Sequence, residues 1–369
     1  MNSIFQRPFV RSLGKLILYI WVGWGAVVTA VAVTFIVPLG FAIALIVAAS
    51  PSATEADTLA NLDTVSGPST SVNELLAVPI EGVIVGSSGE AGLGGSLGNS
   101  ATSGYDVKKM LYDAAGHDEI KGVVLEINSP GGTIYGAHAI ADGVAHYREQ
   151  TKRPVYAHVS GVGASGAYWA AVSTDKVLAD YGSDVGSIGV VLGPFKYYNT
   201  VLSEDGGLLA GGVMTQGGIE SVEITAGRSK DVGNPYRRLT ADEQRLFQQS
   251  VNNEYDNFVQ YVSQRRSIPD ATIRSQIGAM IYDNKSAQSL KLIDATASRD
   301  EAYTQLAKAA GVGDDFRVTR PAGAQGLLTA LLGVVGLTPP KHVATPLDTC
   351  SLTRTTLSYY GSVADLCQK

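Results

Sequence analysis

The sequence predicts an α/β domain with a largely parallel sheet, which follows an apolar N-terminal segment that spans a membrane. Three observations lead to this prediction. Short β-branched runs alternate with helical patterns over residues 76–180, two of the strand-to-helix junctions are rich in glycine, and residues 16–49 contain no charge. The chain has 369 residues, 45% of them apolar and 17% charged, so it can bury a full core.

The apolar segment is the strongest signal of the N-terminal region. Its 34 residues exceed the roughly 20 that a membrane-spanning helix needs. Arg7, Arg11 and Lys15 precede it, and the next basic residue is Lys108. The positive-inside rule therefore predicts a cytoplasmic N-terminus (1–15), a single-pass anchor in the cell membrane (16–49) and an extracytoplasmic remainder.

Two other interpretations of this segment remain open. A cleaved secretory signal is one, although its apolar core usually has only about 7 to 15 residues. The other is a hairpin of two short spans near Pro38, which would return the following domain to the cytoplasm.

Composition divides the rest of the chain. Residues 50–75 are rich in Ser, Thr, Ala and Pro without hydrophobic periodicity, which predicts a flexible linker. Residues 76–310 form the expected folded domain, and 311–369 a C-terminal tail. The net charge of −6, the pI near 5.4 and the lack of a basic block argue against a nucleic-acid partner.

The folded part alternates strands with helices. Apolar runs predict strands at 122–128, 153–161 and 176–180, and either a strand pair or a strand with a bend at 75–86. Apolar residues at helical spacing predict helices at 105–121 and 164–173, and a turn followed by a helix at 129–150. In such a core, functional groups gather where strands end and helices begin.

The first glycine-rich junction reads "INSPGGTIYG". Pro130 fixes one backbone angle, and Gly131 and Gly132 could offer N–H groups to a developing oxyanion because no Cβ blocks the approach. A purely structural turn is the other interpretation.

The second junction reads "SGVGASGAYW". Ser165 begins a helix, with Gly166 after it, and a helix N-terminus favours an alkoxide or its tetrahedral adduct. Close packing of small residues is the other interpretation.

A nucleophilic serine needs a base. The chain has five histidines and none between His158 and His342, which disfavours a Ser-His-Asp triad; His158 itself lies in a predicted strand and is expected to be structural. An unprotonated lysine is the other known base. The residues alone do not choose among the candidates after Ser165, which are Lys176, Lys196, Lys230, Lys285 and Lys291.

Four segments together carry a family resemblance. They are "VLEINSPGGTIYGA", "SGVGASGAYWAAVSTDKVLADYGSDVGSIGVVLG", "TAGRSKDVGNPYRRLTADEQ" and "IGAMIYDNKSAQSLKLID". They resemble, in the same order, the signal peptide peptidase A family of membrane-anchored bacterial serine peptidases. The resemblance covers residues 76–310 and implies a Clp/crotonase-like α/β superhelix of repeated ββα units.

The resemblance also implies the site. Ser165 matches the nucleophile and Lys230 the general base of a Ser-Lys dyad, and Ser187 matches the serine that orients the lysine. The oxyanion donors would be the backbone N–H groups of Gly132 or Gly131, helped by Gly166. No cofactor is implied, and the sequence has no Cys/His cluster that indicates a metal.

The implied partners follow from the same family. They are the membrane, extended peptides such as cleaved signal peptides, and further copies of the chain in a ring-like homo-oligomer, often of eight. The dyad occurs once, so the chain lacks the internal duplication of double-length members. The Gly-rich stretch 201–221 is longer than the family's connection, which puts the substrate-side loop in doubt more than the dyad.

The tail lies outside the resemblance. Its run "GLLTALLGVVGL" is too short to span a bilayer and fits an interfacial or subunit-contact helix. Cys350 and Cys367 would form a disulfide in an extracytoplasmic domain, the alternative being two free thiols.

Two functions compete with a peptidase. A non-catalytic membrane scaffold of the same fold would keep the glycines but would not need Lys230. A crotonase-type acyl-CoA enzyme would be cytoplasmic and would usually use carboxylates. The membrane segment and the Ser/Lys pair favour the peptidase.

Overall fold

The computed structural model describes residues 58–59, 62–87, 101–195, 226, 228–234 and 237–321, and the backbone of 358–360. The predicted cytoplasmic N-terminus, the apolar segment 16–49, Lys196, the Gly-rich stretch 201–221 and both cysteines lie outside these residues. Of the helices within them, none combines the length and apolar character needed to cross a bilayer.

A mixed sheet forms the centre of the fold, in the order β1-β10-β2-β4-β5-β6-β9. The neighbours from β10 to β9 pair in parallel, whereas β1 pairs with β10 in antiparallel fashion. Four short strands extend the sheet within the described residues: β3 beside β2, β7 beside β5, β8 antiparallel to β7, and β11 (Ser358–Tyr360) antiparallel to β4. The bounds are β1 Leu62–Ser66, β2 Glu74–Val85, β3 Ala101–Ser103, β4 Ile120–Thr133, β5 Val155–Ala164, β6 Lys176–Ala179, β7 Asp184–Gly186, β8 Ile281–Asp283, β9 Ala295–Thr296 and β10 Arg317–Pro321.

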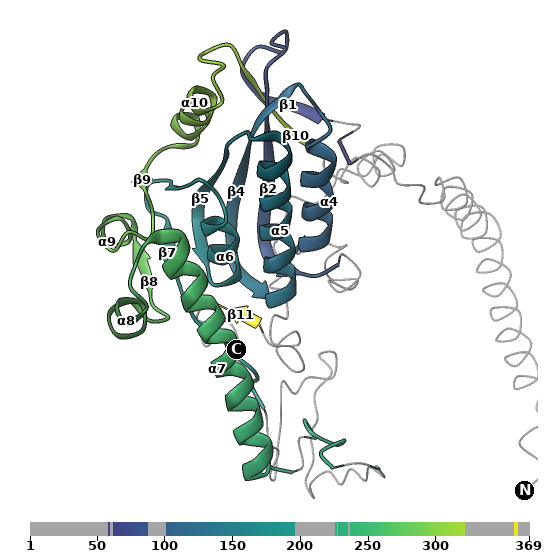
Figure 1. The fold of residues 1–369 in the computed structure, drawn as a ribbon, viewed down its shortest axis with the longest axis vertical. Helices are drawn as coiled ribbons and strands as arrows, with labels where there is room; N and C mark the ends of the chain where they lie inside the picture. The colour runs from purple at the N-terminus through teal and green to yellow at the C-terminus, as the bar shows by residue number, and fades with distance from the viewer. Residues whose placement is uncertain are drawn as a thin grey trace, which may run out of the picture. The chain divides into compact units, whose positions relative to one another are not determined.

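Helices cover both faces of this sheet (Figure 1). On one face, α4 (Gly104–Ala114), α5 (Ile134–Thr151) and α6 (Gly166–Val172) bury the larger apolar cluster. On the other face, α10 (Arg299–Ala309) packs on the alternate residues of the same strands, such as Val124 and Tyr156. The predicted α/β class is therefore confirmed.

The remaining helices lie between β7 and β9 in the sequence. The long α7 (Ala241–Arg266) leads into α8 (Asp270–Thr272), a π-helical turn (Ile273–Ile277) and α9 (Asn284–Ser289). Only the second half of α7 buries apolar side chains, namely Phe258, Val259 and Val262. Its first half extends away from the sheet (Figure 1).

Strands pass into helices without intervening loops. Ser103 ends β3 and caps α4, where its side chain accepts a hydrogen bond from the Asp106 N–H. Thr133 ends β4 and caps α5 in the same way. Because the last strand residue is also the helix cap, the register of each strand fixes where the next helix starts.

Two strands continue beyond the predicted ends, β4 to Thr133 and β5 to Ala164. Of the two alternatives for residues 75–86, the structure has the single strand with a bend, because β2 is one strand with an irregularity near Gly82, whose φ is +66°. Residues 129–133, expected as a turn, continue β4, because Gly131 and Gly132 still pair with β2.

Ordered strands also lie outside the predicted domain bounds. β1 and the start of β2 fall within the stretch 50–75 that was expected as a linker, and β10 falls within the predicted tail 311–369. Strands β1 and β10 pair with each other, although more than 240 residues separate Leu62 from Arg317. Composition does not reveal such long-range pairing.

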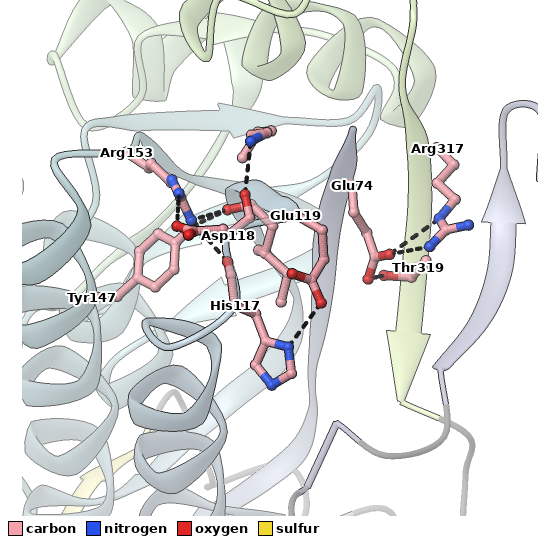
Figure 2. A network of polar contacts seen from close by, with 10 residues as sticks. Glu74, His117, Asp118, Glu119, Tyr147, Arg153, Arg317 and Thr319 are labelled. Carbon is pink, nitrogen blue, oxygen red and sulfur yellow. Dashed lines mark hydrogen bonds and ion pairs between the residues drawn. The ribbon is translucent and has the colours of Figure 1, made fainter. Parts of the chain in front are cut away.

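A buried carboxylate holds β10 against β2 (Figure 2). Glu74 is only 3% exposed and accepts hydrogen bonds from Arg317 at 2.7 and 3.1 Å and from the Thr319 hydroxyl at 2.7 Å. Both partners lie on β10. The contacts compensate the cost of burying the charge, so removing Glu74 leaves Arg317 without this partner.

We expect Glu74→Ala to lower the free energy of unfolding by about 3 kcal/mol, because it breaks a buried ion pair. Urea denaturation followed by circular dichroism measures this. The matched control is Glu119→Ala, which removes a half-exposed carboxylate that contacts His117 at 2.9 Å and should cost less than about 1 kcal/mol. Equal losses in both variants would contradict the assigned role of Glu74.

Candidate active site

Ser165 lies at the turn between β5 and α6 in a strained conformation. Its φ and ψ are +58° and −121°, and it is the N-cap residue of α6. Its N–H donates to the Gly186 carbonyl at 2.9 Å, and its carbonyl accepts from the Trp169 N–H at 2.9 Å. The backbone is therefore fixed on both sides, which holds Ser165 at φ and ψ angles that serine rarely adopts.

The Ser165 hydroxyl is buried without a partner. The residue is 0% exposed, and its Oγ has no hydrogen-bond partner in the described part of the chain. An unsatisfied buried hydroxyl costs about 1–3 kcal/mol, so such a group calls for a functional explanation.

Ser187 follows a neighbouring strand end. β5 and β7 pair in parallel with Ala164 opposite Gly186, so Ser165 and Ser187 each come directly after one member of that pair. Ser187 is 2% exposed, its φ is +55°, and its N–H donates to the Met280 carbonyl at 2.7 Å. The structure thus brings Ser187 next to the Ser165 turn.

The glycines of the "SPGG" stretch, at the end of β4, lie beside the Ser165 turn. Gly132 has no room for a side chain, since a Cβ there would lie 1.9 Å from the Ile84 carbonyl oxygen. A Cβ on Gly166 would lie 3.3 Å from the Gly132 backbone nitrogen. The start of α6 therefore packs directly against the Gly132 backbone; Gly132 has to be glycine, whereas a Cβ on Gly166 would make a tight contact.

Gly131 is used differently. Its φ is +100°, and its N–H donates to the Ser129 hydroxyl at 3.1 Å. Ser129 is fully buried and lies opposite Gly163 in the pairing of β4 with β5. Both glycines were expected as oxyanion donors. The Gly131 N–H already donates to the Ser129 side chain, and in this respect Gly131 differs from Gly132.

Two polar residues that support this region were missed by the sequence analysis. Asn128 Oδ1 accepts from the Val162 N–H at 3.2 Å, and the Ser183 hydroxyl accepts from the Gly161 N–H at 3.1 Å. Both hydrogen bonds hold the C-terminal end of β5, just before Ser165. Asn128 precedes the "SPGG" stretch directly, and this adjacency was the only sequence signal available for it.

Aromatic packing connects α6 to α7. The Trp169 ring stacks on Tyr261 with the centroids 4.1 Å apart, and Phe258 lies 5.3 Å from it. Tyr261 and Phe258 both belong to the second half of α7. This packing fixes where α7 meets the helix that carries Ser165.

Lys230 lies on a turn just before α7. Its side chain is exposed, and it makes no hydrogen bond to the Ser165 hydroxyl, which lacks any partner in the described chain. The turn contacts the start of α7 through Arg237, which pairs with Asp231 and with Glu243. Fifteen residues separate Glu243 from Phe258, about 22 Å along a helix axis.

The other candidate bases lie elsewhere. His158 is fully buried in β5, and its Nε2 lies 3.0 Å from the Ala297 carbonyl oxygen, consistent with the predicted structural role. Lys176 begins β6, Lys285 lies in α9, and Lys291 follows α9, and all three side chains are exposed. None of them bonds to Ser165 within the described residues.

A strand from the C-terminal tail borders the site. The backbone of β11 (Ser358–Tyr360) pairs in antiparallel fashion with the end of β4. The paired residues are Ser358 with Thr133, Tyr359 with Gly132, and Tyr360 with Gly131. An extended peptide segment thus occupies the edge of β4 at the two glycines.

Two family models match parts of this chain. The family "Peptidase family S49" matches residues 147–313, and the Clp protease family matches residues 98–178. A solved structure of a ClpP1 mutant from Listeria monocytogenes is 12% identical, with a TM-score of 0.38, over 61% of this chain and 93% of that one.

Three curated relatives cover the same region. A putative protease of Methanocaldococcus jannaschii is 32% identical over 55% of this chain and 60% of its own length. A putative signal peptide peptidase SppA of Enterococcus faecium is 27% identical over 62% of this chain and 61% of its own. Protease 4 of Haemophilus influenzae is 25% identical over 63% of this chain and 34% of its own.

The chain thus matches about 60% of the length of the first two relatives. The matched region contains Ser165, Ser187 and Lys230, and its relatives include both an SppA and a Protease 4. On these matches, residues 147–313 are similar to peptidase family S49, and the relatives named SppA and Protease 4 support a serine peptidase similar to signal peptide peptidase A.

Proposed function

We propose that this protein is a serine endopeptidase in which Ser165 is the nucleophile and Lys230 the general base. The observation that carries the proposal is the Ser165 turn, where a strained backbone holds a buried, unpartnered hydroxyl at a helix start against the Gly132 backbone. Strained conformations of this kind concentrate at functional sites. A structural serine would gain stability from a hydrogen-bond partner.

The proposed reaction is acyl transfer. Lys230 Nζ takes the Ser165 proton while Oγ attacks the peptide carbonyl carbon, and the same proton then passes to the leaving amine. Water, deprotonated by the lysine, hydrolyses the resulting ester and frees Ser165. The Ser187 hydroxyl, beside the Ser165 turn, would orient the lysine amine.

The developing oxyanion needs donors at the same turn. We assign this role to the Gly132 amide, helped by Gly166, because their backbones lie in contact beside Ser165. The Gly131 amide already donates to Ser129, so we give it a supporting role. The α6 N-terminus adds a favourable partial charge.

The substrate is proposed to bind as an added strand. The pairing of β11 with Gly131–Thr133 supports this, because it shows that the edge of β4 accepts an extended chain at the oxyanion glycines. Cleaved signal peptides, which are extended and apolar, would suit such an edge. The expected membrane anchor at residues 16–49 would place the domain near them, on the extracytoplasmic side of the membrane.

A second copy of the chain is proposed to complete the dyad. Lys230 lies at the far end of α7, about 22 Å along the helix from the Trp169 contact, and its side chain extends only about 6 Å. The projecting half of α7 would bring Lys230 to the Ser165 of a neighbour. This arrangement requires the homo-oligomer and suits the Clp/crotonase-like superhelix that the family resemblance implies.

The first test is peptide cleavage by detergent-purified protein between pH 6 and 10. We expect wild-type kcat/KM to rise with pH, because only the unprotonated amine accepts the serine proton. Ser165→Ala and Lys230→Ala should each lose at least about a thousandfold. Lys285→Ala, which removes an exposed lysine of α9, is the matched control and should keep full activity. Full activity in either dyad variant would refute the assignment.

The second test mixes two inactive variants. Ser165→Ala and Lys230→Ala, dissociated and reassembled together at equal amounts, should regain about one quarter of wild-type activity if the dyad forms between copies at random. A mixture of Ser165→Ala with the double variant carries no intact serine and should stay inactive. No recovery in the first mixture, with assembly verified by light scattering, would mean that both groups come from one chain.

The third test concerns the strand site. A synthetic peptide of residues 355–363 should inhibit competitively, raising the apparent KM without changing kcat, because it would pair with Gly131–Thr133 as β11 does. The same peptide with N-methylated Tyr359 and Tyr360 amides should inhibit at least about tenfold less, since one of these two adjacent N–H groups faces β4 and methylation removes it as a donor. Equal inhibition by both peptides would exclude binding by strand pairing.

A further inference from the structure

We propose that Arg237 is the positioning residue of Lys230, holding the turn that carries the lysine on the first turn of α7. The inference rests on the proposed role of Lys230 as the base. It assigns a function to a residue that contacts neither Ser165 nor the oxyanion glycines in the described structure. The proposal follows from the contacts on both sides of Lys230.

Arg237 joins two carboxylates with four hydrogen bonds. Its Nε and Nη2 donate to Asp231 at 2.7 and 2.8 Å. Its Nη1 and Nη2 donate to Glu243 at 2.9 and 3.0 Å. A planar guanidinium can bind two carboxylates in this way, whereas the compact ammonium of a lysine cannot.

Glu243 is a fixed point for this contact. It is 5% exposed, and it closes a capping box in which it accepts from the Thr240 N–H at 2.8 Å while Thr240 accepts from the Glu243 N–H at 3.2 Å. The capping box ties the carboxylate to the helix start. Whatever bonds to Glu243 is therefore tied to α7.

Both sequence neighbours of Lys230 reach this fixed point. Asp231 reaches Glu243 through Arg237, and Ser229 is among the hydrogen-bonding groups that hold the pKa of Glu243 below its usual value. Lys230 thus lies between two anchored residues while its own side chain stays exposed. This is the arrangement expected for a group that is presented to something outside the turn.

We call Arg237 together with Asp231 and Glu243 the clamp, and these three side chains stay charged through the pH range of the assay. Hydrogen bonds from Arg237 hold the pKa of Asp231 and that of Glu243 below their usual values, and the two carboxylates raise the pKa of Arg237. Lowered carboxylate pKa values mean that the clamp's contribution is present above about pH 4 and is lost as the pH falls further. It is therefore intact between pH 6 and 10.

Other charges surround the clamp. Asp242 pairs with Arg228 at 3.7 Å and with Arg245 at 3.3 Å, and Arg238 follows Arg237 in sequence. If Arg237 is removed, Asp231 and Glu243 lose their shared cation beside the lysine turn. Uncompensated negative charge favours the protonated form of a nearby amine.

The test compares Arg237→Gln, Arg237→Lys and Arg228→Gln for kcat, KM and pH profile with one peptide. We expect Arg237→Gln to lower kcat about a hundredfold with KM changed less than twofold, because the base is misplaced while the strand site is intact. Its pH of half-maximal kcat should rise by about one unit. Arg237→Lys should lower kcat about tenfold without moving the profile, since it keeps the charge and loses the fork.

Arg228→Gln is the matched control. Arg228 belongs to the same turn, but its side chain is 81% exposed and contacts only Asp242 among the ion pairs found, so kcat and profile should stay within twofold of wild type. Thermal unfolding confirms that each variant is folded, and addition of methylguanidine to Arg237→Ala should restore part of its kcat.

The outcomes separate this inference from the proposed function. If Ser165→Ala and Lys230→Ala are inactive but Arg237→Gln keeps wild-type kcat and pH profile, the clamp is refuted and the dyad stands. If Lys230→Ala is active, the dyad fails and the clamp fails with it. Equal effects of Arg237→Gln and Arg228→Gln would also overturn the assignment, because they would reflect the charge of the turn and not the bridge.

Discussion

The candidate site depends on one hydrogen-bonded register, in which three neighbouring strands end side by side. Ser129 lies opposite Gly163 between β4 and β5, and Ala164 lies opposite Gly186 between β5 and β7. A slip of one residue would move Ser165 away from the Gly132 backbone and break its N–H bond to Gly186. The strain at Ser165 is sustained because this register holds its N–H and the first turn of α6 holds its carbonyl.

The two halves of the proposed dyad are held by different means. Ser165 is fixed within the core, by a strand on one side and by the Trp169 packing on the other. Lys230 is fixed by a small polar cluster at the exposed start of a helix. A hydroxyl nucleophile requires precise backbone placement beside its oxyanion donors, whereas a base on a long flexible side chain requires only that its turn be anchored.

Sequence reasoning found the parts that depend on local pattern. The alternation of strands and helices predicted the sheet, and glycine at strand ends pointed to Ser165 and to Gly131 and Gly132. It could not tell the two glycines apart, because the difference is a bond to the Ser129 side chain. The choice of Lys230 came from the family resemblance alone, since spacing does not distinguish one surface lysine from another.

Long-range contacts account for what sequence reasoning missed. Strands β1, β10 and β11 lie outside the predicted domain, yet β1 pairs with β10 and β11 pairs with β4. The periodicity of a short strand does not indicate its partner. Arg237 was overlooked for a related reason. Its two carboxylates lie six residues to either side, so the bridge appears only once the turn before α7 has folded back on the helix.

In the proposed mechanism the serine is preorganised in the core and the lysine is exposed on a separate turn, so assembly of the chains would control when the reaction begins. In the single chain the Ser165 hydroxyl is buried without a partner among the described residues, and the edge of β4 is occupied by β11. If the dyad forms between copies as proposed, a newly made chain carries every group of the site but lacks the contact that activates the serine. Hydrolysis would then begin only after assembly, and after a substrate strand has displaced the tail from Gly131 and Gly132.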